Sequence, residues 1–225
     1  MLKGLTAKTF VTPEYIAGVI STGKWCEHGS CLSRFIEDVA SEHLPEPLLE
    51  TSYDEIIKSD EFAAFLPTWM NKRFAWCKKY IKEDLNTAQD HNGLFTLSRT
   101  IFCTPELLEC IKEKDIDIGR YWTTSGYYAY AHNTDKEKNT LQVTVTASVS
   151  AKDIDFIQTL TSRMDYSNGD DEMEIYIKPT GSPVFLSVSI TTTDDEYLGE
   201  IDCSTPEREK ALLRKQRHLQ NELSL

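Results

Sequence analysis

The stretch Asp171-Glu172-Met173-Glu174-Ile175-Tyr176-Ile177 runs into a turn around Gly181 and then into Val184-Phe185-Leu186-Ser187-Val188. This pattern predicts two strands joined by a glycine-containing turn. Residues two apart in a strand point to the same face, so we expect Glu172 and Glu174 to project side by side. Two carboxylates this close repel each other unless a cation, a metal or a proton offsets them. The pair therefore marks a candidate site.

The first 90 residues have the pattern of helices. Thr12-Pro13-Glu14 has the form of a helix start, with proline at the first helical position. Apolar residues at helical spacing predict a helix between residues 32 and 40 and a longer one from about Thr68 to Leu85. We expect a helical N-terminal part over residues 1–90.

The pattern changes to alternation after residue 90. Residues 94–102 and 141–149 alternate apolar with polar side chains, which is typical of half-buried strands. Between them Thr104-Pro105-Glu106 predicts the start of a short helix. Further strands are expected over about Met173–Lys178, Val184–Thr191 and Tyr197–Cys203.

The expected fold class is α+β in three parts. A helical part covers residues 1–90, a mostly β part covers residues 91–203, and a helix opened by Pro206 lies within residues 204–225. A chain of 225 residues can bury a full core.

The composition limits which classes of partner and which cellular compartment are expected. Hydrophobic content of 40% and charged content of 27% are ordinary for a soluble globular protein. A net charge of −12 argues against non-specific nucleic-acid binding, which needs a cationic surface. We find no secretory signal and no apolar run long enough to span a bilayer, and therefore expect a cytoplasmic protein without a membrane partner.

The cysteine pattern gives little support to a metal site. Cys26 and Cys31 are separated by four residues, and no second Cys or His pair follows at the spacing that zinc sites use. We expect no bound metal.

Three polar motifs follow one another in the β part. Arg99 lies in an otherwise apolar and hydroxylated strand, Thr123-Thr124-Ser125 ends the next one, and Glu172-Met173-Glu174 enters a later one. Each motif alone is commonplace. Their order resembles the Arg–Ser–Glu class of mono-ADP-ribosyltransferases, with the Ser-Thr-Ser motif changed by one hydroxyl-conserving substitution. The resemblance covers about residues 94–200 and implies an ADP-ribosyltransferase-like split β-sandwich that uses NAD as substrate.

The resemblance also implies roles for these side chains. Glu174 would stabilise the oxocarbenium-like state in which the bond between nicotinamide and ribose breaks. Glu172 would orient or deprotonate the acceptor, and Thr123 would hydrogen-bond Glu174 and fix its position. Arg99 would bind the pyrophosphate or the adjacent ribose. The other expected contacts to NAD are Trp122, Thr124, Ser125 and Tyr128.

The loop before the carboxylate pair would select the protein target. It covers residues 164–171, and Tyr166 is the side chain expected to touch the target. Asp171, beside Asp170 and Glu172, would attract a cationic side chain such as arginine.

The resemblance thus predicts an enzyme that transfers ADP-ribose from NAD to a protein side chain, with arginine favoured. Its expected setting is that of a toxin-like effector of a phage or a bacterium. Two alternatives stay open: an inactive, acidic binding or inhibitor protein on the same fold, and an NAD glycohydrolase in which water replaces the protein acceptor.

Overall fold

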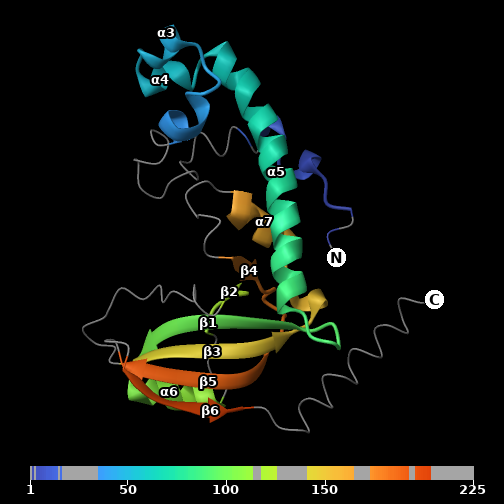
Figure 1. Cartoon of the computed structure of the whole chain (residues 1–225), viewed down its shortest axis with the longest axis vertical. Coiled ribbons are helices and arrows are strands. Elements are labelled where there is room, and N and C mark those ends of the chain that lie inside the picture. Colours follow the sequence, from blue (N-terminus) through green and yellow to red (C-terminus); the bar gives the residue numbers. More distant parts are fainter. Residues whose placement is uncertain are drawn as a thin grey trace, which may run out of the picture. The chain divides into compact units, whose positions relative to one another are not determined.

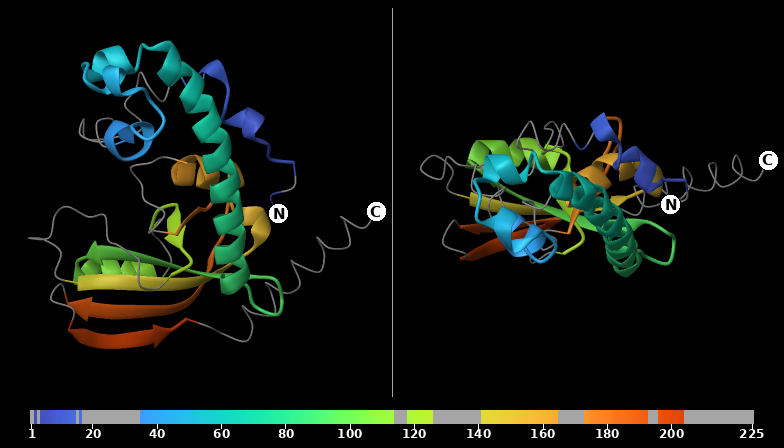
Figure 2. Two further views of the ribbon diagram at one scale, coloured as in Figure 1. Left: turned by 45° about the horizontal axis from the view of Figure 1, so that its top comes forward. Right: turned by 90° about the horizontal axis from the view of Figure 1, so that it is seen from above.

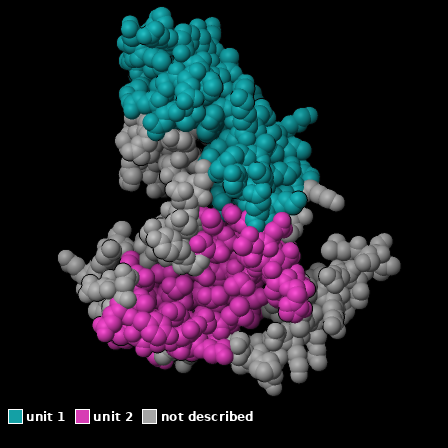
Figure 3. All heavy atoms as spheres, viewed as in Figure 1, with its two compact units in different colours: residues 1–83, 157–171 teal, residues 84–156, 172–225 magenta. Residues whose placement is uncertain are grey.

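The structure of the chain is a computed structural model (Figure 1). It describes residues 2, 4–14, 16, 35–113, 118–125, 141–164, 173–192 and 196–203. The chain divides into two compact units, coloured separately in Figure 3, which are Met1–Glu83 with Ile157–Asp171 and Asp84–Phe156 with Glu172–Leu225. The domain boundaries at residues 90 and 203 stay a prediction.

The first unit is helical. Its elements are η1 (Ala7–Thr9), the π-helix η2 (Ile36–Ala40), α3 (Glu46–Leu49), α4 (Tyr53–Ile56), most of α5 (Asp60–Ala88) and most of α7 (Phe156–Met164).

The long helix α5 begins earlier than the predicted start at Thr68. The side-chain oxygen of Ser59 accepts the backbone N–H of Phe62 at 3.1 Å, which caps the helix, and acidic residues follow in the first turn. Pro67 therefore lies inside the helix.

An apolar stripe explains why α5 continues past this proline. Its buried residues, each at most 7% exposed, recur every three or four positions: Phe62, Leu66, Met70, Phe74, Cys77, Ile81 and Leu85. Aromatic rings pack against the stripe, with Phe35 6.5 Å from Phe62 and Phe10 5.6 Å from Phe74 between ring centroids. The predicted stripe from Met70 to Ile81 is confirmed.

The second unit is built on a six-stranded antiparallel sheet with the order β4-β2-β1-β3-β5-β6. Figure 2 shows the long strands side by side, with α6 (Pro105–Glu113) along one face. The α+β class is confirmed, as are the predicted strands. Their bounds are β1 (Phe95–Cys103), β2 (Tyr121–Thr123), β3 (Leu141–Val149), β4 (Glu174–Tyr176), β5 (Val184–Thr192) and β6 (Tyr197–Asp202).

The two faces of this sheet differ in chemistry. Leu97 of β1 and its partner Ala147 of β3 are fully buried and mark an apolar face. The opposite face carries a row of cross-strand partners with hydroxyl side chains, running Thr123, Ser98, Thr146, Ser187. Because neighbouring residues of a strand point to opposite faces, this row fixes the face of every residue around it.

The connections between strands were predicted only in part. The start of α6 is confirmed, since the Leu107 N–H donates to the Thr104 side chain at 3.3 Å. The helix α7 was not predicted; it buries Leu160 and Met164 and holds three Ser or Thr residues, which blur a helical pattern. The predicted C-terminal helix, residues 204–225, lies outside the described residues.

Within the described part of the chain, no helix combines the length and the apolar character needed to cross a bilayer.

A hydroxyl pair inside the sheet makes the first testable feature. Thr100 is 3% exposed, and its Oγ1 lies 2.7 Å from Oγ1 of its partner Thr144. Thr100→Val should lower the free energy of unfolding by about 1–2 kcal/mol, because it removes one hydroxyl and leaves the other without this bond. The double variant Thr100→Val/Thr144→Val should cost no more than either single one, as measured by urea unfolding. Additive losses would contradict this account.

Candidate functional site

The candidate site centres on two residues at the strand ends of β2 and β4. Thr123 and Glu174 are direct cross-strand partners. Side chains at directly opposed positions have Cβ atoms about 4.5–5.5 Å apart, which is close enough to interact. Thr123 is 4% exposed and Glu174 is half-buried. The predicted juxtaposition of a hydroxyl with the second carboxylate of the motif therefore exists.

The chain after β2 is tied to this pair by two bonds. The backbone N–H of Ser125 donates to Oγ1 of Thr123 at 3.1 Å, a turn in which a hydroxyl replaces a backbone acceptor. The N–H of Thr124 reaches the Met173 carbonyl at 3.5 Å. Thr124 and Ser125, both predicted to bind NAD, thus border Thr123 and are half-buried.

The backbone just before Glu174 is left-handed. Met173 has a φ of +48°, the one positive value among the described non-glycine residues. This conformation costs a non-glycine residue about 1–2 kcal/mol, and such outliers gather at functional sites. The expectation that Glu172 and Glu174 share one face assumes an extended residue between them, and Met173 is not extended. Glu172 itself lies outside the described residues.

Arg99 does not join Thr123 and Glu174. Ser98 is the partner of Thr123, so the next residue, Arg99, points to the opposite face of the sheet. Its Nη1 donates to the Tyr121 carbonyl, and a Cβ added to Gly119 would lie 2.6 Å from Nη2. The guanidinium therefore packs on the backbone that leads into β2. The expectation that Arg99 shares one site with Thr123 is corrected by this register.

Trp122 lies on the apolar face together with Arg99. It is 2% exposed, its indole N–H donates to the Gly119 carbonyl at 3.2 Å, and its ring lies 6.4 Å from that of Phe185 between centroids. A side chain buried in this way packs in the core. The predicted contact between Trp122 and NAD is therefore not supported.

A pair of aromatic rings was missed by the sequence analysis. Tyr121 and Tyr176 are cross-strand partners two residues from Thr123 and Glu174, hence on the same face. Their ring centroids lie 4.9 Å apart with planes at 74°, and Tyr121 is 38% exposed. Their spacing from the two motif residues was the signal that could have identified them.

Several predicted residues lie outside the described part of the chain: Tyr128, Tyr166, Asp171, Cys26 and Cys31. Among the described residues, no three His, Cys, Asp or Glu side chains are grouped so that they could hold a metal ion.

Comparisons with protein-family models, with curated proteins and with solved structures give no significant match.

The left-handed residue can be tested by substitution. Met173→Ala and Met173→Gly both remove the side chain, but only glycine adopts a φ of +48° without strain. The glycine variant should be more stable than the alanine variant by about 1 kcal/mol in urea unfolding. In an extended strand the order would be reversed, with glycine the weaker by about 0.5–1 kcal/mol, and that result would contradict a left-handed backbone at this position.

Proposed function

We propose that this chain is a mono-ADP-ribosyltransferase that moves ADP-ribose from NAD to a protein side chain, with arginine favoured. The proposal depends on one observation: Thr123 is the cross-strand partner of Glu174, and Glu174 directly follows the left-handed residue Met173. The pairing supports the resemblance because the hydroxyl of the second motif and the last carboxylate of the third would have to meet. The ADP-ribosyltransferase-like split β-sandwich is part of this proposal.

The chemistry needs a fixed negative charge beside the ribose. When the bond between C1 of the ribose and the nicotinamide nitrogen breaks, its electron pair leaves with nicotinamide and C1 becomes cationic. The Glu174 carboxylate would stabilise that cation, and Thr123, buried opposite it, would hold the carboxylate in place. The acceptor nitrogen then forms the new bond to C1 and loses a proton, the step proposed for Glu172.

Arg99 enters this proposal as a positioning residue. Its contacts are with the backbone of Gly119 and Tyr121, so it would set where β2 and Thr123 stand. The exposed ring of Tyr121, paired with Tyr176 on the face of Glu174, offers a surface on which a flat ring such as nicotinamide could pack.

One observation favours a second function. Two of the expected NAD ligands, Arg99 and Trp122, lie on the face of the sheet opposite to the Thr123 and Glu174 side chains. A chain that keeps the fold without those ligands and carries a net charge of −12 would suit an inactive acidic protein that binds a basic partner. Release of nicotinamide separates the two functions.

Glu174→Gln should abolish the reaction while the protein stays folded. Removing one electrostatic stabiliser costs about 10²–10³-fold in rate, so nicotinamide release and protein labelling from NAD should both fall by that factor. Glu200→Gln is the matched control, because Glu200 is an exposed carboxylate on β6 of the same sheet. Equal rates for the Glu174 variant and the parent, or no release by the parent with any cell lysate, would remove the enzyme proposal and leave the acidic binding protein.

Arg99→Ala should destabilise the folded protein even in the absence of NAD. Loss of its charged bond to the Tyr121 carbonyl should lower the free energy of unfolding by about 1.5–3 kcal/mol without NAD present. The measurement is urea unfolding beside calorimetric titration with NAD. An unchanged stability with a weakened NAD affinity would restore Arg99 as a direct ligand.

A further inference from the structure

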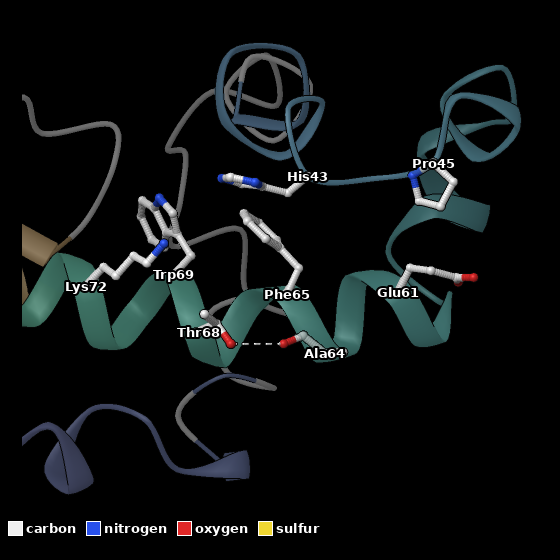
Figure 4. A pocket seen from close by; sticks show the side chains of 8 residues that line it. All are labelled: His43, Pro45, Glu61, Ala64, Phe65, Thr68, Trp69 and Lys72. Carbon is white, nitrogen blue, oxygen red and sulfur yellow. Dashed lines mark hydrogen bonds between the residues drawn. The ribbon is translucent and has the colours of Figure 1, made fainter.

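A groove of about 420 Å³ lies along the first half of α5 in the first unit (Figure 4). Its floor is one face of the helix, formed by residues at positions i, i+3, i+4, i+7, i+8 and i+11: Glu61, Ala64, Phe65, Thr68, Trp69 and Lys72. His43 and Pro45 form the opposite wall. Volumes of 300–1,000 Å³ are usual for small-molecule sites.

A buried ring packs against the two aromatic rings that line the groove floor. Phe35, 1% exposed, packs edge-on against Trp69 with centroids 4.9 Å apart and lies 6.3 Å from Phe65. Phe65 and Trp69 themselves are only half-buried. Rings that are fixed by such contacts and still partly exposed lose little entropy when a flat molecule packs on them.

A third ring reaches this floor from the other wall and contacts it. The imidazole of His43 lies 5.2 Å from the Phe65 ring between centroids, with planes at 34° (Figure 4). Phenylalanine, tryptophan and histidine rings are the side chains on which nucleobases stack. The middle of the groove therefore suits a heteroaromatic ring better than an aliphatic chain.

The charges at the two ends are opposite. Lys72 follows Glu61 by 11 residues, which is about 16 Å along a helix axis. The ammonium group at one end attracts one anionic group, while the carboxylate at the other end repels a second and accepts from an amino group. The Thr68 hydroxyl between them donates to the Ala64 carbonyl at 3.4 Å, so its oxygen can still accept from a ligand.

We propose that this groove binds a nucleoside monophosphate, with the base packed beside the touching rings of His43 and Phe65 and against Trp69, and with the phosphate at Lys72. A single phosphate matches a single cation, and the base amino group would face the Glu61 end. The proposal does not rest on the ADP-ribosyltransferase assignment, because every residue it uses belongs to the first unit and Glu174 to the second.

Titration of the full chain with AMP, followed by ligand-observed NMR, tests the proposal. Lys72→Glu should weaken AMP binding about 10-fold or more, because it replaces an attraction to the phosphate by a repulsion, and should leave adenosine binding nearly unchanged, because adenosine has no phosphate. Lys82→Glu is the matched control, since Lys82 is an exposed lysine of the same helix outside the groove. His43→Ala should weaken AMP and adenosine alike, by about fivefold or more, through lost stacking.

The results that would overturn the proposal are distinct from those that bear on the enzyme. Glu174→Gln should bind AMP as the parent does. The proposal fails if AMP does not saturate the parent, if Lys82→Glu weakens binding as much as Lys72→Glu, or if ribose 5-phosphate binds as well as AMP. None of these outcomes affects the test of the enzyme proposal, which compares nicotinamide release by Glu174→Gln and the parent.

Discussion

The register of β2 between β1 and β4 is the constraint on which the candidate site depends. Thr123 is paired on one side with Ser98 and on the other with Glu174. Because side chains alternate between the two faces of a sheet, this alignment places the Thr123 hydroxyl and the Glu174 carboxylate on one face. It places Arg99 and Trp122 on the other. A slip of β2 by one residue would move only its own side chains: Thr123 would leave the face of Glu174 for that of Arg99, and Trp122 would take its place.

Local bonds hold this register where the strands are shortest. β2 and β4 have three residues each, too few for the ladder alone to specify an alignment. The Arg99 guanidinium donates to a backbone carbonyl at the start of β2, and the Thr123 hydroxyl accepts a backbone N–H in the turn that follows β2. The backbone N–H of Ile177 donates to the Arg120 carbonyl at 2.8 Å. The left-handed Met173 then gives β4 an abrupt start. Together these contacts fix the alignment that places Thr123 beside Glu174, in two short strands that also bury Trp122 and Ile175.

The sequence was sufficient for the long elements and insufficient for the register. Alternation over 141–149 predicts β3 because nine residues repeat a period of two, and the stripe of α5 predicts its core for the same kind of reason. The local sequence does not show whether Ser98 or Arg99 faces the site, because that depends on which of the two residues is the cross-strand partner of Thr123. The positive φ of Met173 was equally hidden, since methionine rarely adopts it. The groove beside Trp69 escaped because aromatic stripes usually form core, and its second wall comes from His43, far away in sequence.

Whether NAD binds on the face of the sheet that carries Thr123 and Glu174 is the question that tests the proposed function most directly. A crystal structure of the chain with a non-hydrolysable NAD analogue would locate the nicotinamide ribose. The account predicts a ribose hydroxyl within hydrogen-bond distance, about 2.6–3.2 Å, of the Glu174 carboxylate, on the face that carries Thr123 and Tyr121. An analogue bound on the face of Arg99 and Trp122, or away from the sheet, would contradict it.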